Sequence, residues 1–350
     1  MQEEIISKAA SQFGTGKIQI EKLGEGLIHR TFRVKYSDPE QWIVLQCINQ
    51  NTFPQPENII HNYRTIYNYL QHLHPGRSVI PSMILTNHGK LFHIDIEGNF
   101  WRATEYMPNT YSIPVSKNEK EAFWAAKCFG RLVNDLSGLA EDSLHTVIPG
   151  FHDLNNRYRQ FETAVKNANI KRLLPATHLI AELRQRRYLL EFYNEVISDE
   201  SFKKRFMHHD CKINNVLFDK DTVLPVCAVD LDTVMSGYFF SDLGDMIRTM
   251  ACSLDENSVD WENLQVDKNL YDSILRGYLE GTENVFTKKE IEHLHYSGLL
   301  ITFMQSLRFL ADYLNNDVYY NISYPEQNLN RALNQLLLLE KLEALTGINS

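Results

Sequence analysis

The sequence predicts an α+β protein with two domains, a small antiparallel sheet with one helix over residues 1–107 and a larger, mainly helical domain over residues 108–350. Short β-prone runs separated by turn residues fill most of the first hundred positions. Apolar residues at helical spacing dominate the remainder of the chain. The character of the sequence changes at Tyr106-Met107-Pro108-Asn109, and the domain boundary is therefore placed there.

The first domain is predicted to consist of strands around a single helix. Two β-prone runs, residues 31–36 and 41–46, flank a group of turn residues and indicate a hairpin. A helix is expected between Pro56, which suits a first helical turn, and Pro75-Gly76, which stops a helix. Further strands are expected at residues 80–86, 91–96 and 99–105.

The second domain is predicted to be helical apart from one stretch. Residues 206–245 read as loop, strand, turn, strand and loop, with the two strands at 216–218 and 226–229. The expected helices lie at residues 119–139, 155–167, 176–198, 270–279, 288–314 and 327–345.

Composition excludes several classes of protein. The net charge of -9 argues against a broad surface for nucleic acid or for anionic membranes. No apolar run approaches the roughly 20 residues that cross a bilayer, and the N-terminus does not resemble a signal peptide. The five cysteines are scattered without zinc spacing, which is typical of reduced thiols. We expect a cytoplasmic protein with a small-molecule partner, and the sequence does not predict its oligomeric state.

The stretch from Phe206 to Asp245 carries seven aspartates among apolar residues. Its hairpin would bring Asp210, Asn215 and Asp230 together at one end, and would leave two further aspartates, Asp219 and Asp221, at the solvated turn. Carboxylate and amide oxygens are hard ligands that suit Mg²⁺ and are poor for zinc. A carboxylate held away from the metal could orient a substrate hydroxyl.

The ordered pattern His208-x-Asp210, Asn215 and then Asp230 after a hairpin resembles the core of the aminoglycoside phosphotransferase/choline kinase-like superfamily. The resemblance implies a protein-kinase-like bilobal fold and ATP-dependent phosphoryl transfer. It also implies that Asp210 faces the acceptor hydroxyl while Asn215 and Asp230 hold Mg²⁺ on the ATP phosphates. Asp232 is then expected to support these ligands or to bind a second metal ion.

The first domain would cover the nucleotide under this resemblance. Gly24 and Gly26 lie in a turn whose backbone could approach phosphates, and backbone groups from Glu105 to Met107 would meet adenine. Kinase-like folds carry a phosphate-binding lysine in the third strand, but Gln46 occupies that position here. Gln46 cannot form the usual ion pair with a helix glutamate, for which Glu57 is the candidate. The chain is then either an inactive kinase or one that contacts the nucleotide differently.

A closer resemblance favours an active enzyme. The strings LQCINQNTFPQPENIIHN, IPGFHDLNNRY, VDLDTVMSGYFFSDLGDMIRT and RFLADYLNNDVYY are similar to segments of N-acetylhexosamine 1-kinases, in the same order. The resemblance implies transfer to the anomeric hydroxyl of an N-acetylhexosamine. The substrate-binding residues that it implies are Thr233, Arg308, Tyr319 and His29, although His29 stands where that group has asparagine.

Several alternatives stay open. Arg308 could instead pair with Asp312 on a helix surface, and Asp242 and Asp245 are expected to cap a helix and brace the catalytic hairpin. His152 and Arg157 are weaker substrate candidates. The acceptor could be another alcohol, an amino alcohol or an aminoglycoside, or the chain could be a nucleotide-binding pseudokinase that acts as a scaffold.

Overall fold

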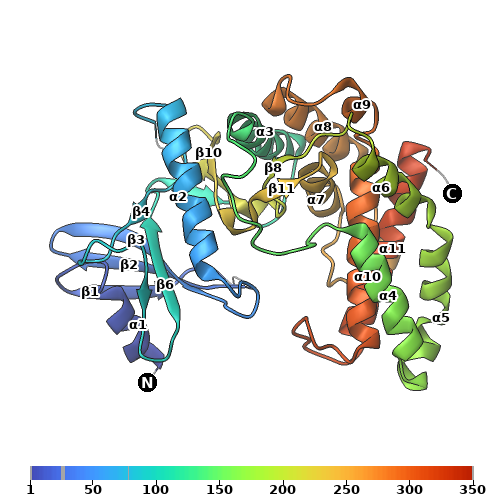
Figure 1. Cartoon of the computed structure of the whole chain (residues 1–350), viewed down its shortest axis with the longest axis horizontal. Coiled ribbons are helices and arrows are strands. Elements are labelled where there is room, and N and C mark those ends of the chain that lie inside the picture. The colour runs from blue at the N-terminus through green and yellow to red at the C-terminus, as the bar shows by residue number, and fades with distance from the viewer. Residues whose placement is uncertain (1, 25–27, 78, 349–350) are drawn as a thin grey trace. The chain divides into compact units, whose positions relative to one another are not determined.

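The computed structural model describes residues 2–24, 28–77 and 79–348, and it divides into two compact units (Figure 1). The first unit comprises Met1–Tyr111, Gly138–Pro149 and Leu217–Met235. The second comprises Ser112–Ser137, Gly150–Val216 and Ser236–Ser350. The first unit therefore includes two later segments in addition to the residues before the boundary predicted at residue 107.

The first unit contains an antiparallel sheet in the order β1-β2-β3-β6-β4, with β5 paired to β6. Residue Tyr36 of β2 pairs with Gln41 of β3, which confirms the predicted hairpin. The next pairing places Gln46 of β3 opposite Arg102 of β6. The strands are β1 (Ile18–Lys22), β2 (Arg30–Ser37), β3 (Glu40–Ile48), β4 (Met83–Ile84), β5 (His93–Ile94) and β6 (Phe100–Glu105).

Two of the later predicted strands are much shorter than expected. β4 and β5 have two residues each, because side chains rather than a strand ladder hold the adjoining loops. The Asp95 carboxylate accepts hydrogen bonds from the backbone N–H groups of Glu97 and Asn99 and from the indole of Trp101. Thr86 Oγ1 likewise accepts from the N–H of Lys90. Local polar groups have therefore taken the place of strand pairing.

Two helices accompany this sheet. α2 (Pro56–Leu73) begins at the predicted proline and ends before Pro75. α1 (Gln2–Ala10) was not predicted, because alanines form much of its apolar face and large side chains give little periodic signal. Ala10 lies in the core of the sheet, and its carbonyl accepts a hydrogen bond of 2.7 Å from the Tyr36 hydroxyl.

The hairpin predicted within residues 216–229 is confirmed as β9 (Val216–Asp219) and β10 (Pro225–Ala228). It extends into a three-stranded sheet with β7 (Thr110–Ser112). Asn109 donates to the Asp221 carboxylate at the turn of this hairpin, at 2.7 Å. The turn therefore lies against the segment that precedes β7.

The second unit is mainly helical, as predicted, with one two-stranded sheet of β8 (Arg205–Met207) and β11 (Met235–Gly237). The helices predicted at 176–198 and 288–314 are each divided in two, since the segments 186–187 and 293–295 interrupt them. α7 was not predicted as a helix. The helices are α3 (Glu119–Leu136), α4 (Leu154–Asn167), α5 (Ile170–Gln185), α6 (Tyr188–Ser198), α7 (Phe240–Met250), α8 (Lys268–Thr282), α9 (Lys288–Glu292), α10 (Tyr296–Leu314) and α11 (Gln327–Thr346).

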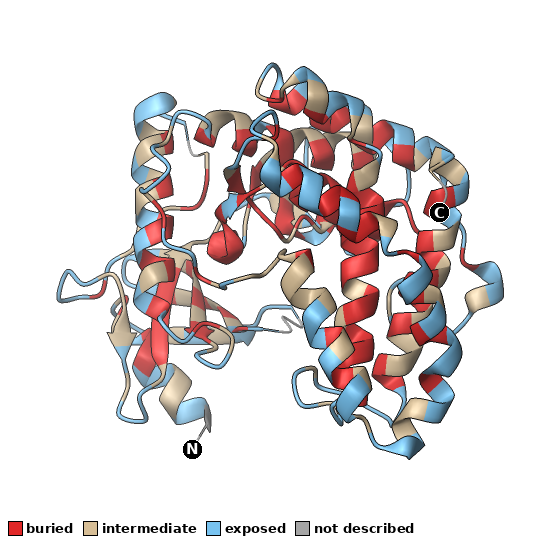
Figure 2. Ribbon diagram, turned by 45° about the vertical axis from the view of Figure 1, so that its right-hand side comes forward, coloured by how far each residue is buried: buried red, intermediate tan, exposed pale blue. Residues whose placement is uncertain are grey.

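The helical core is organised around α10, which is buried along most of its length (Figure 2). α3 and α8 approach closely at three glycines. A Cβ atom at Gly277 would lie 2.2 Å from the carbonyl oxygen of Phe123, and one at Gly281 would lie 2.4 Å from that of Lys127. A Cβ atom at Gly130 of α3 would lie 2.6 Å from the carbonyl oxygen of Tyr278. The two backbones therefore touch at positions that only glycine can occupy.

Within the described residues, no helix combines the length and the apolar character that a membrane span requires.

Candidate functional site

The loop after β8 carries the predicted catalytic segment within the second unit. His209, just before Asp210, adopts the left-handed conformation with φ of 67°, which is uncommon for a residue with a side chain. The Asp242 carboxylate holds this loop by accepting from the backbone N–H groups of His208 at 3.0 Å and His209 at 2.8 Å. Gly237 leaves room for the His209 ring, because a Cβ there would lie 2.5 Å from Cε1.

Asp242 thus holds the loop that precedes the hairpin, whereas the predicted capping role of Asp242 and Asp245 is wrong. α7 begins at Phe240 and has Phe239 as its N-cap residue, so both aspartates lie inside the helix. Asp245 pairs instead with Arg248 one turn later, at 2.9 Å. The buried carboxylates therefore bind the loop before Asp210 and an arginine rather than the helix terminus.

Asp210 is held as a carboxylate. Asn215 Nδ2 donates to the Asp210 backbone oxygen at 2.9 Å and to its Oδ2 at 3.1 Å, and Lys212 Nζ lies 3.1 Å from Oδ1. Burial raises the pKa of Asp210, but Lys212, His208 and the hydrogen bond from Asn215 outweigh burial, so the pKa lies below its ordinary value. Asp210 is consequently ionised at neutral pH and can accept a proton or a hydrogen bond.

The donor set suits a hard cation. Asn215 uses its amide nitrogen to hold Asp210, and its Oδ1 has no partner among the residues that the structure describes. An amide oxygen and carboxylates are the ligands that Mg²⁺ takes in phosphotransferases. The 3-10 turn Ile213–Asn215, called η1, fixes the amide immediately before β9.

A group of basic side chains lies on the same unit as Asp210. This basic cluster consists of Arg157, Arg308, His152 and His209. Arg308 lies over the ring of Phe151, with its guanidinium carbon 5.4 Å from the ring centroid, and its Nη1 donates to Gln305. The Nδ1 atoms of His152 and His209 are 3.1 Å apart.

The two arginines of the basic cluster form no ion pair with a carboxylate in the described part of the chain. Burial and, after it, the neighbouring charge of Arg308 lower the pKa of Arg157 to about 10. Arg157 donates to the carbonyl of Phe151 and to Gln160. Uncompensated guanidinium groups of this kind disfavour a cationic ligand and favour a neutral or anionic one.

The alternative pairing of Arg308 with Asp312 is wrong. The Asp312 carboxylate instead accepts from the backbone N–H groups of Tyr319 at 2.8 Å and Tyr320 at 2.9 Å, and from the Asn328 amide. This fixes the loop after α10, and Arg308 lies 5.6 Å from the Tyr320 ring centroid. Tyr319 itself is exposed beside Tyr320.

The basic cluster predicts a pH dependence of stability. Burial lowers the pKa of His152 well below its ordinary value, and His209, Arg308 and Arg157 lower it further. A histidine with a depressed folded-state pKa contributes stability that is complete above its unfolded pKa of about 6.5 and is lost as pH falls toward the folded value. We expect the melting temperature to fall between about pH 7 and pH 5, and to fall less in His152→Gln, as measured by thermal unfolding.

The exposed His178→Gln variant is the matched control, and it should keep the wild-type slope of melting temperature against pH. Equal slopes in His152→Gln and the wild type would contradict the assignment of this stability to His152.

Asp230 and Asp232 belong to the first unit and lie on one turn. Asp230 is exposed and left-handed, with φ of 60° and ψ of 53°, and it precedes the 3-10 turn Leu231–Thr233, called η2. Asp232 is buried: His29 Nε2 lies 2.8 Å from its Oδ2, and Arg102 contacts both oxygens at 2.6 and 2.7 Å. Thr233 follows it and is also buried.

Arg102 is a residue that the sequence reasoning missed. Gln46 Oε1 accepts from Arg102 Nε at 3.0 Å and from Nη2 at 2.8 Å, and Gln46 donates to Thr31 at 3.3 Å. The available signal was a basic residue among the four buried residues that begin the strand FWRATE. The Asp232 partner lies 130 positions later, so no local pattern connects the two.

His29 has a defined tautomer in this arrangement. Its Nδ1 accepts from the backbone N–H of Asn49 at 3.0 Å, so Nε2 carries the ring proton and donates it to Asp232. His29, Asp230 and Asp232 offer ligand atoms within 4.8 Å of one another. Because the Nε2 proton and the Arg102 guanidinium already engage Asp232, this geometry favours a network of fixed charges over a metal site.

The other predicted nucleotide-contacting residues lie in the first unit. Gly24 adopts a left-handed φ of 68°, and Gly26 lies outside the described residues. Glu105 ends β6 and accepts from the Ser82 hydroxyl at 2.9 Å. The carbonyl of Met107 accepts from Thr110, whereas Glu57 is exposed and has no ion pair within the described chain.

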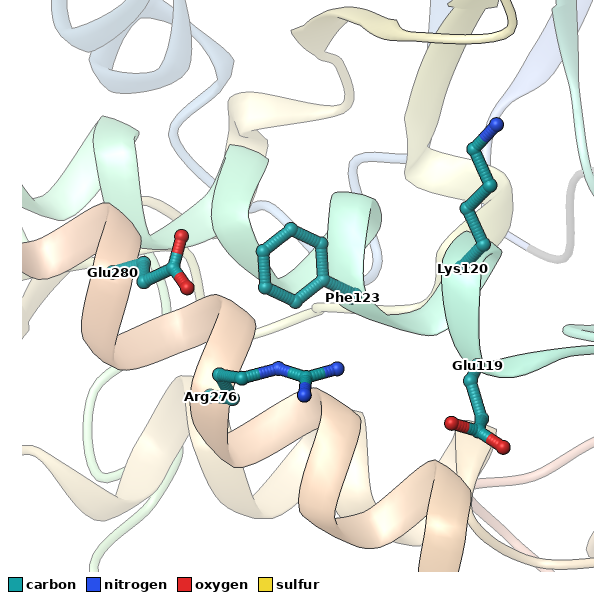
Figure 3. Close-up of a pocket in the computed structure, with 5 residues that line it drawn as sticks. All are labelled: Glu119, Lys120, Phe123, Arg276 and Glu280. Carbon is teal, nitrogen blue, oxygen red and sulfur yellow. The ribbon is translucent and has the colours of Figure 1, made fainter.

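A separate hollow lies between the beginning of α3 and α8 in the second unit. Figure 3 shows Phe123 at its centre, with Arg276 beside the ring. The Arg276 guanidinium carbon is 5.3 Å from the ring centroid, and Glu280 is paired to Lys127. None of the predicted site residues lines this hollow. The residues that line it are Glu119, Lys120, Phe123, Arg276 and Glu280.

The class of protein is a small-molecule phosphotransferase. The family match supports this class, and the sheet unit, the helical unit and the Asp210–Asn215 loop are consistent with it. The model of the phosphotransferase enzyme family (APH) matches residues 19–283, and the chain belongs to this family.

Three solved structures with the same fold are distant from this chain in sequence. Spectinomycin phosphotransferase, in complex with ADP and spectinomycin, is 13% identical, covers 97% of this chain and 96% of its own, and has a TM-score of 0.62. A microcompartment-associated aminopropanol kinase is 17% identical over 99% of both chains, with a TM-score of 0.63. A choline/ethanolamine kinase family protein from Mesorhizobium loti is 15% identical over 98% and 94%, with a TM-score of 0.62. They confirm the predicted protein-kinase-like α+β fold.

Proposed function

We propose that the protein transfers the γ-phosphate of ATP to the anomeric hydroxyl of an N-acetylhexosamine. The phosphotransferase family and the ADP in the spectinomycin phosphotransferase complex support a nucleotide donor. The observation that carries the choice of acceptor is the basic cluster, whose two arginines have no carboxylate partner in the described residues. The resemblance to N-acetylhexosamine 1-kinases supplies the position of the hydroxyl.

In this mechanism Asp210 accepts the hydrogen bond of the acceptor hydroxyl and takes its proton as the new oxygen–phosphorus bond forms. The bond between the γ-phosphorus and the bridging oxygen breaks, and ADP leaves. Mg²⁺, when bound, neutralises charge on the phosphates, and Asn215 and Asp230 would hold it. Asn215 has a second task, because its amide nitrogen fixes the Asp210 carboxylate.

The basic cluster is suited to a neutral polyhydroxylated acceptor. Arg308 can donate to a hydroxyl or to an acetamido carbonyl, while Phe151 and Tyr320 offer flat apolar surfaces beside it. Tyr319 and Thr233 are proposed as further contacts to the sugar. A polycationic aminoglycoside would place its ammonium groups near Arg157 and Arg308, where like charges repel.

The experiment is release of ADP from ATP across a panel of acceptors, with and without Mg²⁺. N-acetylglucosamine and N-acetylgalactosamine should support turnover, whereas choline, ethanolamine and kanamycin should not. Turnover confined to an amine-bearing alcohol would overturn the acceptor assignment. Tight ATP binding without turnover on any acceptor would favour the pseudokinase scaffold, for which Gln46 is the supporting observation.

Replacing Arg308 by glutamine tests the contact directly. Loss of one charged hydrogen bond to the acceptor should raise the KM for the sugar roughly tenfold or more, with little change in the KM for ATP. Arg184→Gln is the matched control, because Arg184 is an exposed arginine of the same unit that is paired to Glu162. If both variants changed the KM for the sugar equally, Arg308 would not be a sugar contact.

A further inference from the structure

The third-strand lysine of kinase-like folds forms an ion pair with a helix glutamate, and both partners are missing from that role here. Gln46 occupies the lysine position, and Glu57 is exposed without an ion pair in the described chain. The same strand pair nevertheless contains a cation. Arg102 stands opposite Gln46 in the β3–β6 register and is almost completely buried.

Gln46 and Asp232 together occupy the donors of Arg102. Nε and Nη2 contact Gln46 Oε1, while Nη1 and Nη2 contact the two oxygens of Asp232. Nε and Nη2 of this guanidinium therefore donate hydrogen bonds inside the protein, and Nη1 is held by the ion contact with Asp232 at 2.6 Å. Arg102 is accordingly unsuited to act as a direct phosphate ligand in place of the lysine.

The other end of the network is the turn that carries Asp230. Asp232 lies within η2, two residues after Asp230, and Arg102 and His29 fix its carboxylate from β6 and from the segment before β2. Asp230 is in a left-handed conformation that a residue with a side chain adopts only when its surroundings enforce it. The network supplies such surroundings, because both oxygens of Asp232 are held.

We propose a fixed hydrogen-bonded and ionic network that consists of Gln46, Arg102, Asp232 and His29. This network replaces the lysine–glutamate ion pair and positions Asp230 for Mg²⁺. Arg102 is a positioning residue that acts through Asp232, and Gln46 orients its guanidinium plane. In this proposal Gln46 has a positioning role in an active enzyme and does not indicate that activity has been lost. This inference rests on the proposed use of Mg²⁺ and nucleotide, but it does not depend on the identity of the acceptor.

The sharpest test is to restore the lysine. In Gln46→Lys the ammonium group would face the Arg102 guanidinium, so we expect weaker Mg²⁺-dependent nucleotide binding and no gain of activity. The readout is the Mg²⁺ concentration that half-saturates ADP binding to the full chain, measured by calorimetry without any acceptor. It should rise roughly 10–100-fold, the usual cost of losing a partner that orients metal ligands.

Three further variants separate positioning from folding. Gln46→Asn removes the contacts to Arg102 without adding charge, and Arg102→Lys keeps the charge but loses the planar fork; both should raise the Mg²⁺ requirement. In Gln46→Lys/Arg102→Gln the lysine no longer faces a like charge, so part of the loss should be recovered. Glu57→Gln is the matched control and should behave as the wild type.

Two of these results would contradict the proposed positioning role of the network. A Gln46→Lys protein that binds Mg²⁺ and ADP as well as the wild type, or better, would overturn the proposal. An unchanged Mg²⁺ requirement in Gln46→Asn and Arg102→Lys, with only the melting temperature lowered, would show that the network is purely structural. Failure of the sugar panel alone would leave these binding results intact, so the two proposals fail separately.

Discussion

Asp210→Asn should abolish phosphoryl transfer while the protein stays folded and binds nucleotide. The amide cannot take the proton of the acceptor hydroxyl, and a positioned base typically contributes about 10²–10⁴-fold to the rate. The substitution is nearly isosteric, and the Asn215 amide could still donate to the new side-chain oxygen. The measurement is ADP release with the best acceptor from the panel, beside ADP binding by calorimetry.

The control for this variant is Asp219→Asn at the far turn of the hairpin. Asp219 accepts hydrogen bonds from Thr222 and the backbone of its own turn, so its replacement should affect local stability and leave turnover near normal. Near-normal turnover in Asp210→Asn would remove the residue from the proposed reaction centre.

Gly277→Ala should be among the most destabilising single substitutions in the helical unit. Alanine is the better helix former by about 1 kcal/mol, so propensity alone predicts stabilisation. The added Cβ would lie 2.2 Å from the Phe123 carbonyl oxygen, and a backbone atom cannot rotate away. We expect a loss of about 3 kcal/mol in unfolding free energy, measured by denaturant titration, because the two helices must separate.

The effect should also reach the loop that carries Asp210. Phe129 of α3 packs edge-on against the His208 ring, with centroids 5.1 Å apart, so displacement of α3 removes support from the segment before Asp210. Asp272→Ala on the exposed face of α8 is the matched control and should cost less than about 1 kcal/mol, since it breaks only a surface ion pair. Equal losses in the two variants would show that close packing at Gly277 is unimportant.

Local patterns predicted much of the fold. Turn residues between β-prone runs identified both the β2–β3 hairpin and the β9–β10 hairpin, because neighbouring strands need only local information to pair. α1 and α7 were missed for different reasons. α1 presents alanines to the core, and α7 carries buried aspartates that read as cap residues.

The candidate site was predicted unevenly. The sequence singled out Asp210, Asn215 and Asp230 because their order and spacing are specific. It could not reveal that Asp232 is bound by His29 and Arg102, since these contacts join residues 203 and 130 positions apart. Helical spacing also could not show that Arg308 does not pair with Asp312. The Asp312 carboxylate accepts hydrogen bonds from the loop after α10 instead. Tertiary contacts decided these pairings.

The strand register that sets Gln46 against Arg102 has an evolutionary consequence. The proposal predicts that positions 46 and 102 are coupled: lysine at the first and arginine at the second would place like charges side by side, and the loss of Arg102 would leave the buried Asp232 without its cation. Considered alone, Gln46 would therefore be mistaken for a lost catalytic residue. The residues at positions 46 and 102 would act as one unit, so the activity of a chain with glutamine at position 46 is better judged from both positions together.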